Sequence, residues 1–593
     1  MILSEENSAL MISPSLLKKD SVRIFQNCKR IIRLKEFGTF EEFFDEAEKS
    51  VAAGEHLLSY IPYETGYIFE KKFEKILSDK EIRESALSAS FFCYENSLEL
   101  TPDLSDFSFD TEKAAVKDFA INRSKEEFRD DIELIRAHIK EGDTYQVNYT
   151  VQGSFSFEGD FTDLLLSCVY NQSADYVFLI NHGGKLTYSI SPELFFTKTG
   201  DQITVRPMKG TTKRGDDLKQ DNALIKKLFT SEKERAENVM IVDLMRNDLA
   251  RICKPGSVTV KELFRIETYE KVHQMVSTIT GSIEKGKSLS DIFRSIFPCG
   301  SITGAPKIRT MEIIREREQR VRGIYCGSIG FIEGENASFN VAIRTFEIDK
   351  STRKGIIGLG SGIVFDANPE SEYEETLLKG TFLTNPGREF FIFESLLLKR
   401  AKYDYLKDHI QRLNRTAEFL DFKIDHYDLA VKINTTPIVR SYHPYKIKFS
   451  VSKYGFVSVD ETRIFSEKGV KRVGIADEML PVKDKFRLYK TTIRDVYNRW
   501  YAKATEEGLY DYLFFNEEGY LLEGCINNVV IQEGDKAFTP PIKLHILPGI
   551  MLSKLKKVYK VTEELITKDR LLNADKIYLC NSVRGAHVVK LIL

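Results

Sequence analysis

The sequence of 593 residues is poor in the features that mark several classes of protein. It holds one tryptophan and eight cysteines, none of them in a Cys-x-x-Cys pair, and its nine histidines do not cluster with the cysteines. This pattern excludes a disulfide framework and favours a reducing compartment and a chain without a thiol-bound metal. Lys and Arg (86) nearly balance Asp and Glu (88), so the net charge of −2 gives no electrostatic reason to expect nucleic acid or an anionic membrane as a partner.

Long apolar runs are also absent. Residues 1–17 mix acidic residues with short apolar pairs, and form neither a signal-peptide core nor a membrane span, which needs about 20 apolar residues. We therefore expect a cytoplasmic location. Hydrophobic residues at 42% and charged residues at 29% are typical of a globular protein, and the length predicts at least two large domains. Small molecules are the expected partners.

The stretch Arg206–Thr211 stands out in the first half of the chain. It follows the alternating run Gln202–Val205, which predicts a strand, and its proline and glycine turn the chain. A turn at Gly200-Asp201 predicts a hairpin that brings Glu193 near Lys209. An acid beside a lysine suggests proton transfer, although a weak surface ion pair is the more common meaning of such a pair.

Two predicted helices each present a pair of glutamates. Ser231 and Glu234 form a capping-box pattern at the start of one helix, and Asn368 followed by proline begins the other. Residues three apart share a helix face, so each pair is expected to point the same way. The pairs are Glu234 with Glu237 and Glu372 with Glu375. They could hold a hard cation such as Mg²⁺ through oxygen ligands, or they could be two solvated acidic faces.

Glycine-rich segments lie between these helices. Phe297–Lys307 includes Thr303, and Gly358–Gly362 has three glycines in five residues. Glycines let backbone N–H groups approach an anion closely, although each group could equally be turning the chain. Arg344 is predicted in a strand, where its guanidinium could bind a carboxylate through two hydrogen bonds. Together these features predict a site for a small, multiply anionic ligand.

Five segments carry a family resemblance. They are Arg206–Thr211, Arg235–Asp248, Cys299–Lys307, Arg322–Gly330 and Pro369–Lys379. Together they closely resemble the chorismate-utilising enzymes, which include anthranilate synthase, isochorismate and salicylate synthases and aminodeoxychorismate synthase component I. The resemblance covers roughly residues 120–380. It implies an α+β fold in which residues 1–384 form a chorismate-binding β-sheet sandwich flanked by helices, with residues 1–120 as scaffold.

The same resemblance implies roles for individual residues. Mg²⁺ would bridge a chorismate carboxylate, with Glu237 and Glu375 as direct ligands and Glu234 and Glu372 acting through water. A second set would contact the substrate's carboxylates and ring: Thr303, Gly304, Arg344, Gly360, Gly362, Lys379, Tyr325 and His273. Taken by itself, His273 is more typical of a core histidine whose hydrogen bonds are satisfied.

Lys209 distinguishes the branches of this family. Anthranilate synthases resemble the chain but carry a small residue at this position, whereas Pro-x-Lys-Gly-Thr is similar to the aminodeoxychorismate branch. The implied chemistry is attack of the Lys209 amine on C2 of chorismate while Glu193 protonates the departing C4 hydroxyl. Ammonia then adds at C4 and expels the lysine, which must be neutral when it attacks. Asn238, where anthranilate synthases usually have histidine, favours the same branch.

A second pattern begins after the predicted linker at residues 385–388. Phe390–Leu397 predicts a strand and Tyr405–Phe419 a helix. Asp511–Phe515 and Tyr520–Glu523 predict a hairpin. Leu547–Ile550 introduces another helix, whose start suits a phosphate.

Residues 389–593 resemble the fold-type-IV pyridoxal-phosphate (PLP) enzymes, a two-subdomain fold, and most closely aminodeoxychorismate lyase. The matching segments are Phe393–Leu396, His409–Leu413, Tyr489–Thr492, Leu522–Gly524 and Leu547–Ile550. The resemblance implies the following site: Lys490 holds PLP and moves protons, Glu523 pairs with the pyridine nitrogen, Ser395 relays a proton, and Arg412 with the backbone of Gly549, Ile550 and Met551 holds the phosphate. Asn527-Asn528 and Leu552 depart from the usual pattern. The relatives also include branched-chain and D-amino-acid aminotransferases.

The two resemblances together predict a bifunctional enzyme of 4-aminobenzoate synthesis. Chorismate and ammonia would give aminodeoxychorismate, from which the second module would eliminate pyruvate. No Gly-x-Cys-x-Gly motif of a glutamine amidotransferase is present, so a separate amidotransferase subunit is expected to supply ammonia. A homodimer through the PLP module is a further expectation. The alternatives are an anthranilate synthase component fused to an aminotransferase, and a chain in which one module is a non-catalytic binding domain.

Overall fold

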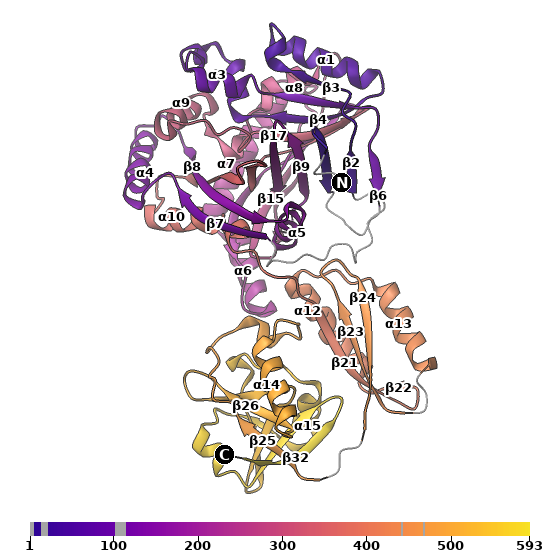
Figure 1. Ribbon diagram of the computed structural model, residues 1–593. Helices are drawn as coiled ribbons and strands as arrows, with labels where there is room; N and C mark the ends of the chain where they lie inside the picture. Colours follow the sequence, from indigo (N-terminus) through magenta and orange to yellow (C-terminus); the bar gives the residue numbers. More distant parts are fainter. Residues whose placement is uncertain are drawn as a thin grey trace. The chain divides into compact units, whose positions relative to one another are not determined.

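The structure, a computed structural model, describes residues 5–12, 22–100, 114–172, 174–439, 443–465 and 469–592. Parts of the N-terminal stretch 1–17 and of the scaffold 1–120 lie outside these ranges. The chain divides into two compact units. The first comprises Met1–Gly215 and Lys219–Glu389, and the second comprises Asp216–Leu218 and Phe390–Leu593 (Figure 1).

The described part of the first unit contains two ten-stranded antiparallel sheets. In the first sheet the order is β16 (Gly304–Ala305), β8 (Gln146–Gly159), β20 (Lys354–Ile363), β19 (Thr345–Asp349), β10 (Lys185–Ser191), β9 (Tyr176–His182), β1 (Ser8–Ile12), β2 (Val22–Phe25) and β6 (Leu98–Leu100), and β7 (Ala114–Ile121) also pairs with β8. Residues from 8 to 363 thus contribute to one sheet, so it forms only through contacts between distant parts of the sequence.

The second sheet contains the predicted hairpin before Lys209. Its order is β13 (Met208–Lys213), β15 (Val272–Ser282), β12 (Gln202–Arg206), β11 (Leu194–Thr199), β18 (Asn336–Asn340), β17 (Ser328–Glu333), β4 (His56–Ile61), β5 (Ser90–Tyr94) and β3 (Arg30–Arg33), and β14 (Thr259–Thr268) also pairs with β15. The pairing of β11 with β12 is antiparallel, with Leu194 opposite Arg206. The hairpin prediction is therefore confirmed.

The two sheets pack through an apolar layer, and helices cover the outer face of the second sheet. Phe25 of the first sheet lies 5.2 Å from Tyr94 and 5.7 Å from Phe331 of the second, measured between ring centroids. Side chains alternate between the two faces of a strand. The residues next to these in the second sheet therefore point to its opposite face, into a core shared with the helices. Phe44 of α1 and Phe293 of α8 meet there at 5.0 Å. The predicted helix-flanked sandwich is confirmed.

The described helices of the first unit agree with the capping signals in the sequence. They are α1 (Phe40–Ala52), α2 (Glu74–Leu77), α3 (Lys80–Ala86), α4 (Lys125–Lys140), α5 (Phe161–Asn171), α6 (Leu218–Thr230), α7 (Glu232–Ala250), α8 (Leu289–Ile296), α9 (Lys307–Glu318), α10 (Pro369–Leu378) and α11 (Thr381–Thr384). Asn368 caps α10 as predicted. At α7 only half of the capping box forms: Ser231 accepts the N–H of Glu234, but its own N–H bonds to Leu228 of α6.

The second unit has two sheets among its described residues. The smaller is antiparallel, in the order β22 (Lys402–Tyr403), β21 (Ile392–Lys399), β23 (Tyr445–Val451) and β24 (Val457–Arg463). The larger is mixed, in the order β27 (Leu521–Gly524), β26 (Asp511–Phe515), β25 (Lys471–Ile475), β32 (Gly585–Leu591), β31 (Lys576–Asn581), β28 (Asn528–Glu533), β29 (Lys536–Thr539) and β30 (Thr562–Glu563). The predicted hairpin of β26 and β27 is confirmed.

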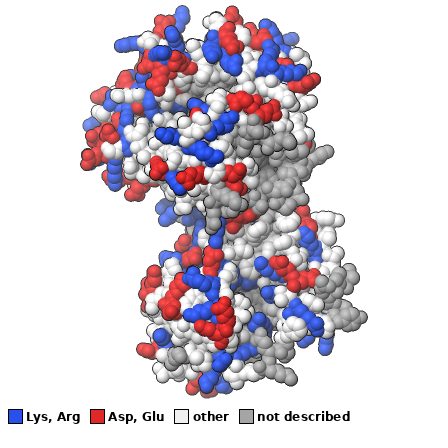
Figure 2. Space-filling view, in the orientation of Figure 1, with Lys and Arg blue, Asp and Glu red and all other residues white. Residues whose placement is uncertain are grey.

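Five helices are described in the second unit: α12 (Leu406–Leu420), α13 (His426–Val439), α14 (Asp495–Glu506), α15 (Ile550–Tyr559) and α16 (Lys568–Leu572). α12 packs on β21, and α14 packs on β26. No helix in the described ranges is long and apolar enough to cross a membrane. Acidic and basic side chains are intermingled over the visible face, as the near-zero net charge predicts (Figure 2).

Candidate active sites

A cavity of about 300 Å³ in the first unit gathers most of the predicted residues from separate elements. We call it the first-unit cavity. The predicted residues that line it are Glu193, Lys209, Glu234, Glu237, Tyr325, Arg344, Gly360, Gly362, Glu372, Glu375 and Lys379. They come from both sheets and from α7 and α10. The cavity is therefore the point at which segments far apart in the sequence meet.

The two glutamate pairs face the cavity from different helices. Burial raises the pKa of Glu234, and the neighbouring Glu237 raises it further. Burial also raises the pKa of Glu372, with a smaller contribution from Glu375. Burial would raise the pKa of Glu375 as well, but the ion pair with Lys379 outweighs it and the net shift is downward. Carboxylates that repel one another in a half-buried site favour a bound cation.

Two lysines pair with one glutamate from each helix. Lys209 Nζ lies 3.4 Å from the carboxylate of Glu237, and Lys379 Nζ lies 2.7 Å from that of Glu375. Lys379 also donates to the carbonyl of Gly360 at 3.0 Å. Among the described residues, no three of the four glutamates bring their oxygen atoms within 4.8 Å of one another. One glutamate of each helix is therefore paired with a lysine in this structure.

Glu193 is the most deeply buried acid of the cavity. Its carboxylate accepts a hydrogen bond from the Ser301 hydroxyl at 2.6 Å, and its side chain is 3% exposed. Burial raises its pKa to about 7, although the Ser301 bond and the charge of Lys209 pull in the opposite direction. A carboxyl with this pKa is partly protonated near neutral pH and can serve as a general acid.

Arg344 presents an uncompensated guanidinium to the cavity. Burial lowers its pKa to about 10, and within the described ranges no side chain forms an ion pair with it. The expectation of a strand at this residue is wrong, because Arg344 lies before β19 with φ = 50°. The left-handed backbone interrupts the regular strand geometry, so the side chain of Arg344 does not follow the alternation of strand residues between the two faces of the sheet. Such a group is suited to bind a carboxylate.

The glycines of β20 leave room for two neighbouring side chains. A Cβ on Gly358 would lie 2.0 Å from the Tyr325 ring, and a Cβ on Gly362 would lie 2.7 Å from Lys209 Nζ. Side chains at these positions would displace the tyrosine and the lysine. The glycine row therefore allows Tyr325 and Lys209 to reach the cavity over the sheet.

Three predicted substrate contacts do not line the cavity: His273, Thr303 and Gly304. His273 is fully buried between Asp221 and Thr268, to which its ring nitrogens bond at 3.0 Å each, so it is a core histidine. Thr303 is fully buried as well, and Gly304 packs on the Gln146 carbonyl in β8. The packing of β15 and β16 turns all three away from the cavity.

Ser301 and Tyr269 are among the side chains of the cavity wall that sequence reasoning missed. Ser301 lies in the glycine-rich segment Phe297–Lys307, but its hydrogen bond to Glu193 joins the short helical turn Gly300–Ile302 to the residue before β11, which is 108 positions away in the sequence. Tyr269 donates to Glu267 at 3.0 Å, and Glu267 also accepts from Arg206 at 2.5 Å. Tyr269 follows β14 without any motif around it, so the sequence offered no signal for it.

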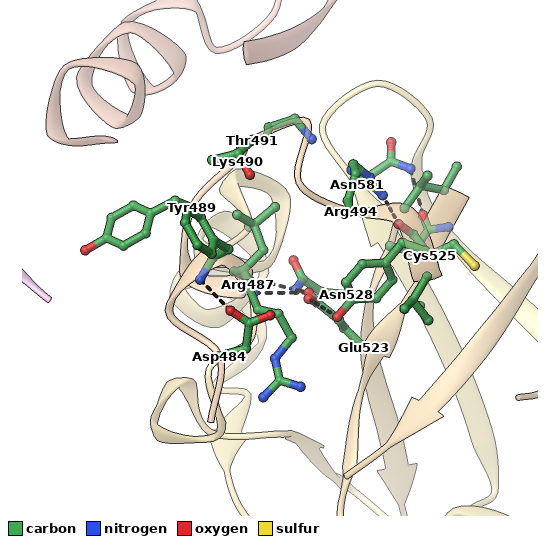
Figure 3. Close-up of a pocket in the computed structure, with 18 of the residues that line it drawn as sticks. Asp484, Arg487, Tyr489, Lys490, Thr491, Arg494, Glu523, Cys525, Asn528 and Asn581 are labelled. Atoms are coloured by element: carbon green, nitrogen blue, oxygen red, sulfur yellow. Dashed lines mark hydrogen bonds between the residues drawn. The ribbon is translucent and has the colours of Figure 1, made fainter. Parts of the chain in front are cut away.

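The second unit contains a cavity of about 320 Å³, which we call the second-unit cavity. Of the predicted residues, Arg412, Lys490, Glu523, Gly549 and Ile550 line it. Figure 3 draws Lys490 and Thr491 on the loop before α14, and Glu523 beside Asn528 on the larger sheet. Neither Ser395 nor Met551 lines the cavity: Ser395 lies on β21, and Met551 lies within the first turn of α15.

Lys490 and Glu523 carry opposite pKa shifts. Burial, together with the charges of Arg412 and Arg494, lowers the pKa of Lys490 to about 7. Burial raises the pKa of Glu523 to about 7 against the hydrogen bonds that it accepts. These bonds come from Tyr497 at 3.2 Å, from the Leu547 N–H at 3.1 Å and from the Asn528 amide at 3.3 Å. An amine that is neutral near pH 7 can act as a nucleophile or base.

Arg412 is oriented by a buried acid. Its guanidinium forms two hydrogen bonds with Glu394, at 2.6 and 2.7 Å, and a third with the Pro548 carbonyl at 3.3 Å. His409 bonds to the same carboxylate at 2.6 Å. Burial would raise the pKa of Glu394, but Arg412 and His409 outweigh it and lower that pKa to about 2. The arginine is thus fixed beside the start of α15, where a phosphate group fits.

The match of the first unit determines the family to which the chain belongs. Residues 18–385 match the protein family described as chorismate binding enzyme, which is more than half of the chain. This chain belongs to the chorismate-binding enzyme family. Residues 391–592 match the family described as amino-transferase class IV. The predicted α+β arrangement of a chorismate-binding unit followed by a class IV aminotransferase-like unit is confirmed, and we propose that the boundary lies at residues 385–388.

The curated relatives of this chorismate-binding chain carry two different names. It is 40% identical over 270 residues to aminodeoxychorismate synthase component 1 of Salmonella typhimurium, covering 45% of this chain and 58% of that protein. It is 37% identical over 285 residues to anthranilate synthase component 1 1 of Haloarcula marismortui, covering 48% and 57%. The chain therefore spans less than two thirds of either relative. Anthranilate synthase component I of Streptococcus pneumoniae TIGR4, at 21% identity and a TM-score of 0.52 over 61% of this chain and 92% of that one, shows the fold alone.

The donor sets fit the cofactors implied by the two families. Carboxylate oxygens are the ligands that Mg²⁺ prefers, and the two helices offer four of them around a half-buried space. In the second-unit cavity, Nε of Arg494 and one terminal nitrogen of Arg487 are buried and lack acceptors among the described residues. Unpartnered guanidinium nitrogens around an amine and a carboxylate suit PLP, whose phosphate is anionic.

Proposed function

We propose that the chain catalyses two consecutive steps of 4-aminobenzoate synthesis. The first unit would convert chorismate and ammonia into 4-amino-4-deoxychorismate, and the second would eliminate pyruvate from that product. The observation that carries the first assignment is the amine of Lys209, which lines the same cavity as Glu193. The relatives alone do not choose between aminodeoxychorismate and anthranilate formation. A lysine in contact with the substrate supplies the chemistry that distinguishes them.

The charged residues Arg344, Lys209, Glu193 and the four glutamates of the first-unit cavity then have distinct roles. Arg344 would bind a substrate carboxylate, and the four glutamates would hold Mg²⁺, which would supply positive charge for another carboxylate. The Lys209 nitrogen attacks C2 while Glu193 gives its proton to the C4 hydroxyl, which leaves as water as both ring double bonds shift. Ammonia next forms a bond at C4, both double bonds return to their original positions, and the C2–nitrogen bond to Lys209 breaks. Glu193 regains a proton before the next turnover.

In the second unit the chain's residues bind the cofactor and move protons. Arg412 and the start of α15 would hold the phosphate of PLP, and Glu523 would pair with the pyridine nitrogen. PLP supplies the electron sink for the elimination. Lys490, whose pKa of about 7 leaves much of it neutral at physiological pH, takes a proton from the ring and returns one as pyruvate leaves and the ring becomes aromatic. We keep Ser395 as a candidate proton relay only on the grounds of its motif.

Ammonia is proposed to come from a separate glutamine amidotransferase subunit. Support comes from the sequence, in which no cysteine lies in a Gly-x-Cys-x-Gly motif. Purified chain should form aminodeoxychorismate with ammonium salts and hardly at all with glutamine. Strong activity with glutamine in the absence of a partner would contradict this proposal.

Product analysis tests the whole assignment. Purified chain is incubated with chorismate, ammonium, Mg²⁺ and PLP, and the products are separated by liquid chromatography. We expect 4-aminobenzoate and pyruvate in equal amounts. Anthranilate would identify the first unit as an anthranilate synthase component. Aminodeoxychorismate that accumulates without 4-aminobenzoate would refute the lyase assignment for the second unit and leave the first assignment intact.

A further inference from the structure

The second unit contains a buried carboxylate that the proposed mechanism does not use. Asp511 begins β26 and is 0% exposed. It accepts the backbone N–H groups of Tyr512 at 2.8 Å, Cys525 at 2.8 Å and Ile526 at 3.4 Å, and the side-chain amide of Asn527 at 2.7 Å. Among the described residues, all the groups that bond to Asp511 are therefore donors, as a carboxylate requires. The nitrogen of the Asn527 amide must face Asp511, and its oxygen must face away.

Asn527 passes this orientation to a second amide. Its Oδ1 accepts a hydrogen bond from Nδ2 of Asn581 at 2.7 Å, although the two residues are 54 positions apart in the sequence. Oδ1 of Asn581 then faces the other way, where it accepts the N–H groups of Val583 at 3.0 Å and Arg584 at 2.7 Å. We call Asp511, Asn527 and Asn581 the Asp511 relay, and residues 581–584 the β31 turn.

The two ends of the Asp511 relay require the same amide orientation. A carboxylate can only accept at one end, and two backbone N–H groups can only donate at the other. An amide turned the wrong way would place donor against donor or acceptor against acceptor in a buried site, which is costly. The carboxylate of Asp511 therefore determines how the β31 turn is held.

The relay leads from the interior of the unit to the cavity wall. Asn527, Asn581 and Ser582 line the second-unit cavity, whereas Asp511 does not. Asn581 is among the residues labelled around this cavity in Figure 3. Asp511 can thus act on a ligand in the cavity only through the other members of the relay.

The β31 turn adjoins the start of α15. Cys580, the residue before the turn, lies opposite Asn528 in the antiparallel pairing of β31 with β28. The Asn528 amide donates to the carbonyl of Leu547 at 2.9 Å, and a Cβ on Gly549 would lie 1.8 Å from Asn528 Oδ1. The helix α15 also packs on β31. The turn therefore borders the place where the phosphate of PLP is proposed to bind.

We propose that Asp511 is a positioning residue for the cofactor site of the second unit: through Asn527 and Asn581 it fixes the β31 turn against the start of α15. The inference rests on the proposed function for its ligand, PLP. Asn527 is one of the residues that depart from the usual sequence pattern of the fold-type-IV enzymes. Its amide bonds at both ends and so joins the buried carboxylate to the turn.

Asp511→Asn tests the relay with almost no change in volume. The new NH₂ group meets the donors that converge on Asp511, so the amides of Asn527 and Asn581 should reverse and the β31 turn should lose its hydrogen bonds. The affinity of the full chain for PLP is measured by quenching of the fluorescence of Trp500, the single tryptophan, which lies on α14. We expect binding about ten-fold weaker than that of the wild type.

A second variant cuts the relay in its middle. Asn527→Ala leaves the three backbone hydrogen bonds of Asp511 in place and should also weaken PLP binding about ten-fold. In this background Asp511→Asn should add little, because its effect passes through Asn527. As a matched control, Asn573→Ala removes an exposed amide that donates to the Asp569 carbonyl, and it should bind PLP as the wild type does.

Hydrogen exchange follows the turn itself without cofactor. The amides of Val583 and Arg584 should exchange faster in Asp511→Asn and in Asn527→Ala than in the wild type, as measured by mass spectrometry of the peptide that contains them. Asn573→Ala should leave their exchange unchanged. If Asp511→Asn does not fold, Asn527→Ala decides the question alone.

The outcomes separate the relay from the proposed function. Wild-type PLP affinity or wild-type exchange of the turn in the relay variants would overturn the relay, and so would a further ten-fold loss when the two substitutions are combined. A wild type that binds PLP but forms no 4-aminobenzoate would refute the proposed function and leave the relay intact. A wild type that does not bind PLP would refute both.

Discussion

Ser301 provides the sharpest test of the chemistry in the first unit. Its hydroxyl donates to Glu193 at 2.6 Å and stabilises the charged form of a carboxyl whose pKa burial raises to about 7. Ser301→Ala removes this bond. A hydrogen bond to a charged group contributes about 1.5 kcal/mol at the lower end, and one pKa unit corresponds to about 1.4 kcal/mol. The pKa of Glu193 should therefore rise by about one unit in the variant.

Loss of the Ser301–Glu193 hydrogen bond is expected to extend the pH range of activity. Glu193 acts as an acid and must be protonated, so activity should fall as pH rises through its pKa. The wild type should lose activity above about pH 7, and Ser301→Ala should retain it to about one pH unit higher. The assay is aminodeoxychorismate formation between pH 6 and 9, with the concentration of free ammonia held constant.

Two controls separate this reasoning from a general disturbance of the cavity. Ser301→Thr keeps the hydroxyl and should follow the wild-type profile. Glu193→Gln cannot titrate and should lose both the activity and the alkaline limb. The reasoning is refuted if the alkaline limb of the pH–activity profile does not move in Ser301→Ala. It is also refuted if that limb persists in the residual activity of Glu193→Gln, because Glu193 is then not the acid that the profile reports.

Three further predictions concern single residues. Lys209→Ala should lower aminodeoxychorismate formation at least about a thousand-fold while calorimetry shows chorismate binding retained; an unchanged rate would remove the lysine from the mechanism. Lys490→Ala should abolish the visible absorption of bound PLP without unfolding the chain, and persistence of that absorption would place the cofactor on another lysine. Glu394→Gln should lower the free energy of unfolding of the second unit by about 3 kcal/mol, measured by urea denaturation at pH 7. The pKa of Glu394 is depressed to about 2 from an ordinary 4.5, so its contribution is present above pH 4.5, and the difference from wild type should vanish as pH falls toward 2.

The sequence was informative where the physical cause is local. Helix starts depend on one capping side chain and its neighbours, so Ser231 and Asn368 marked α7 and α10 to the residue. Glutamates three apart share a helix face in any surroundings, which is why the two members of each pair could be expected to point the same way before their helices were placed. Motif resemblance supplied what local chemistry could not, namely that the two helices belong to one site.

The errors share a different cause. Whether a side chain faces a cavity depends on which strands pair and on where the backbone leaves its regular conformation. His273 points into the core because Asp221 of α6, 52 residues earlier in sequence, packs against it. Arg344 reaches the first-unit cavity because its φ of 50° interrupts a run that reads as a strand. No pattern of neighbouring residues encodes either event.

The sequence by itself determined the two-part organisation, the starts of α7 and α10, the hairpins β11–β12 and β26–β27, and the identity of Lys209, Glu193, Lys490 and Glu523 as candidates. Only the tertiary structure decided how readily these groups gain or lose a proton. Burial among distant elements moves the pKa of Glu193, Lys490 and Glu523 to about 7, where protons can be exchanged at neutral pH. Desolvation of these groups acts only once the chain has folded, so no local pattern of residues encodes it.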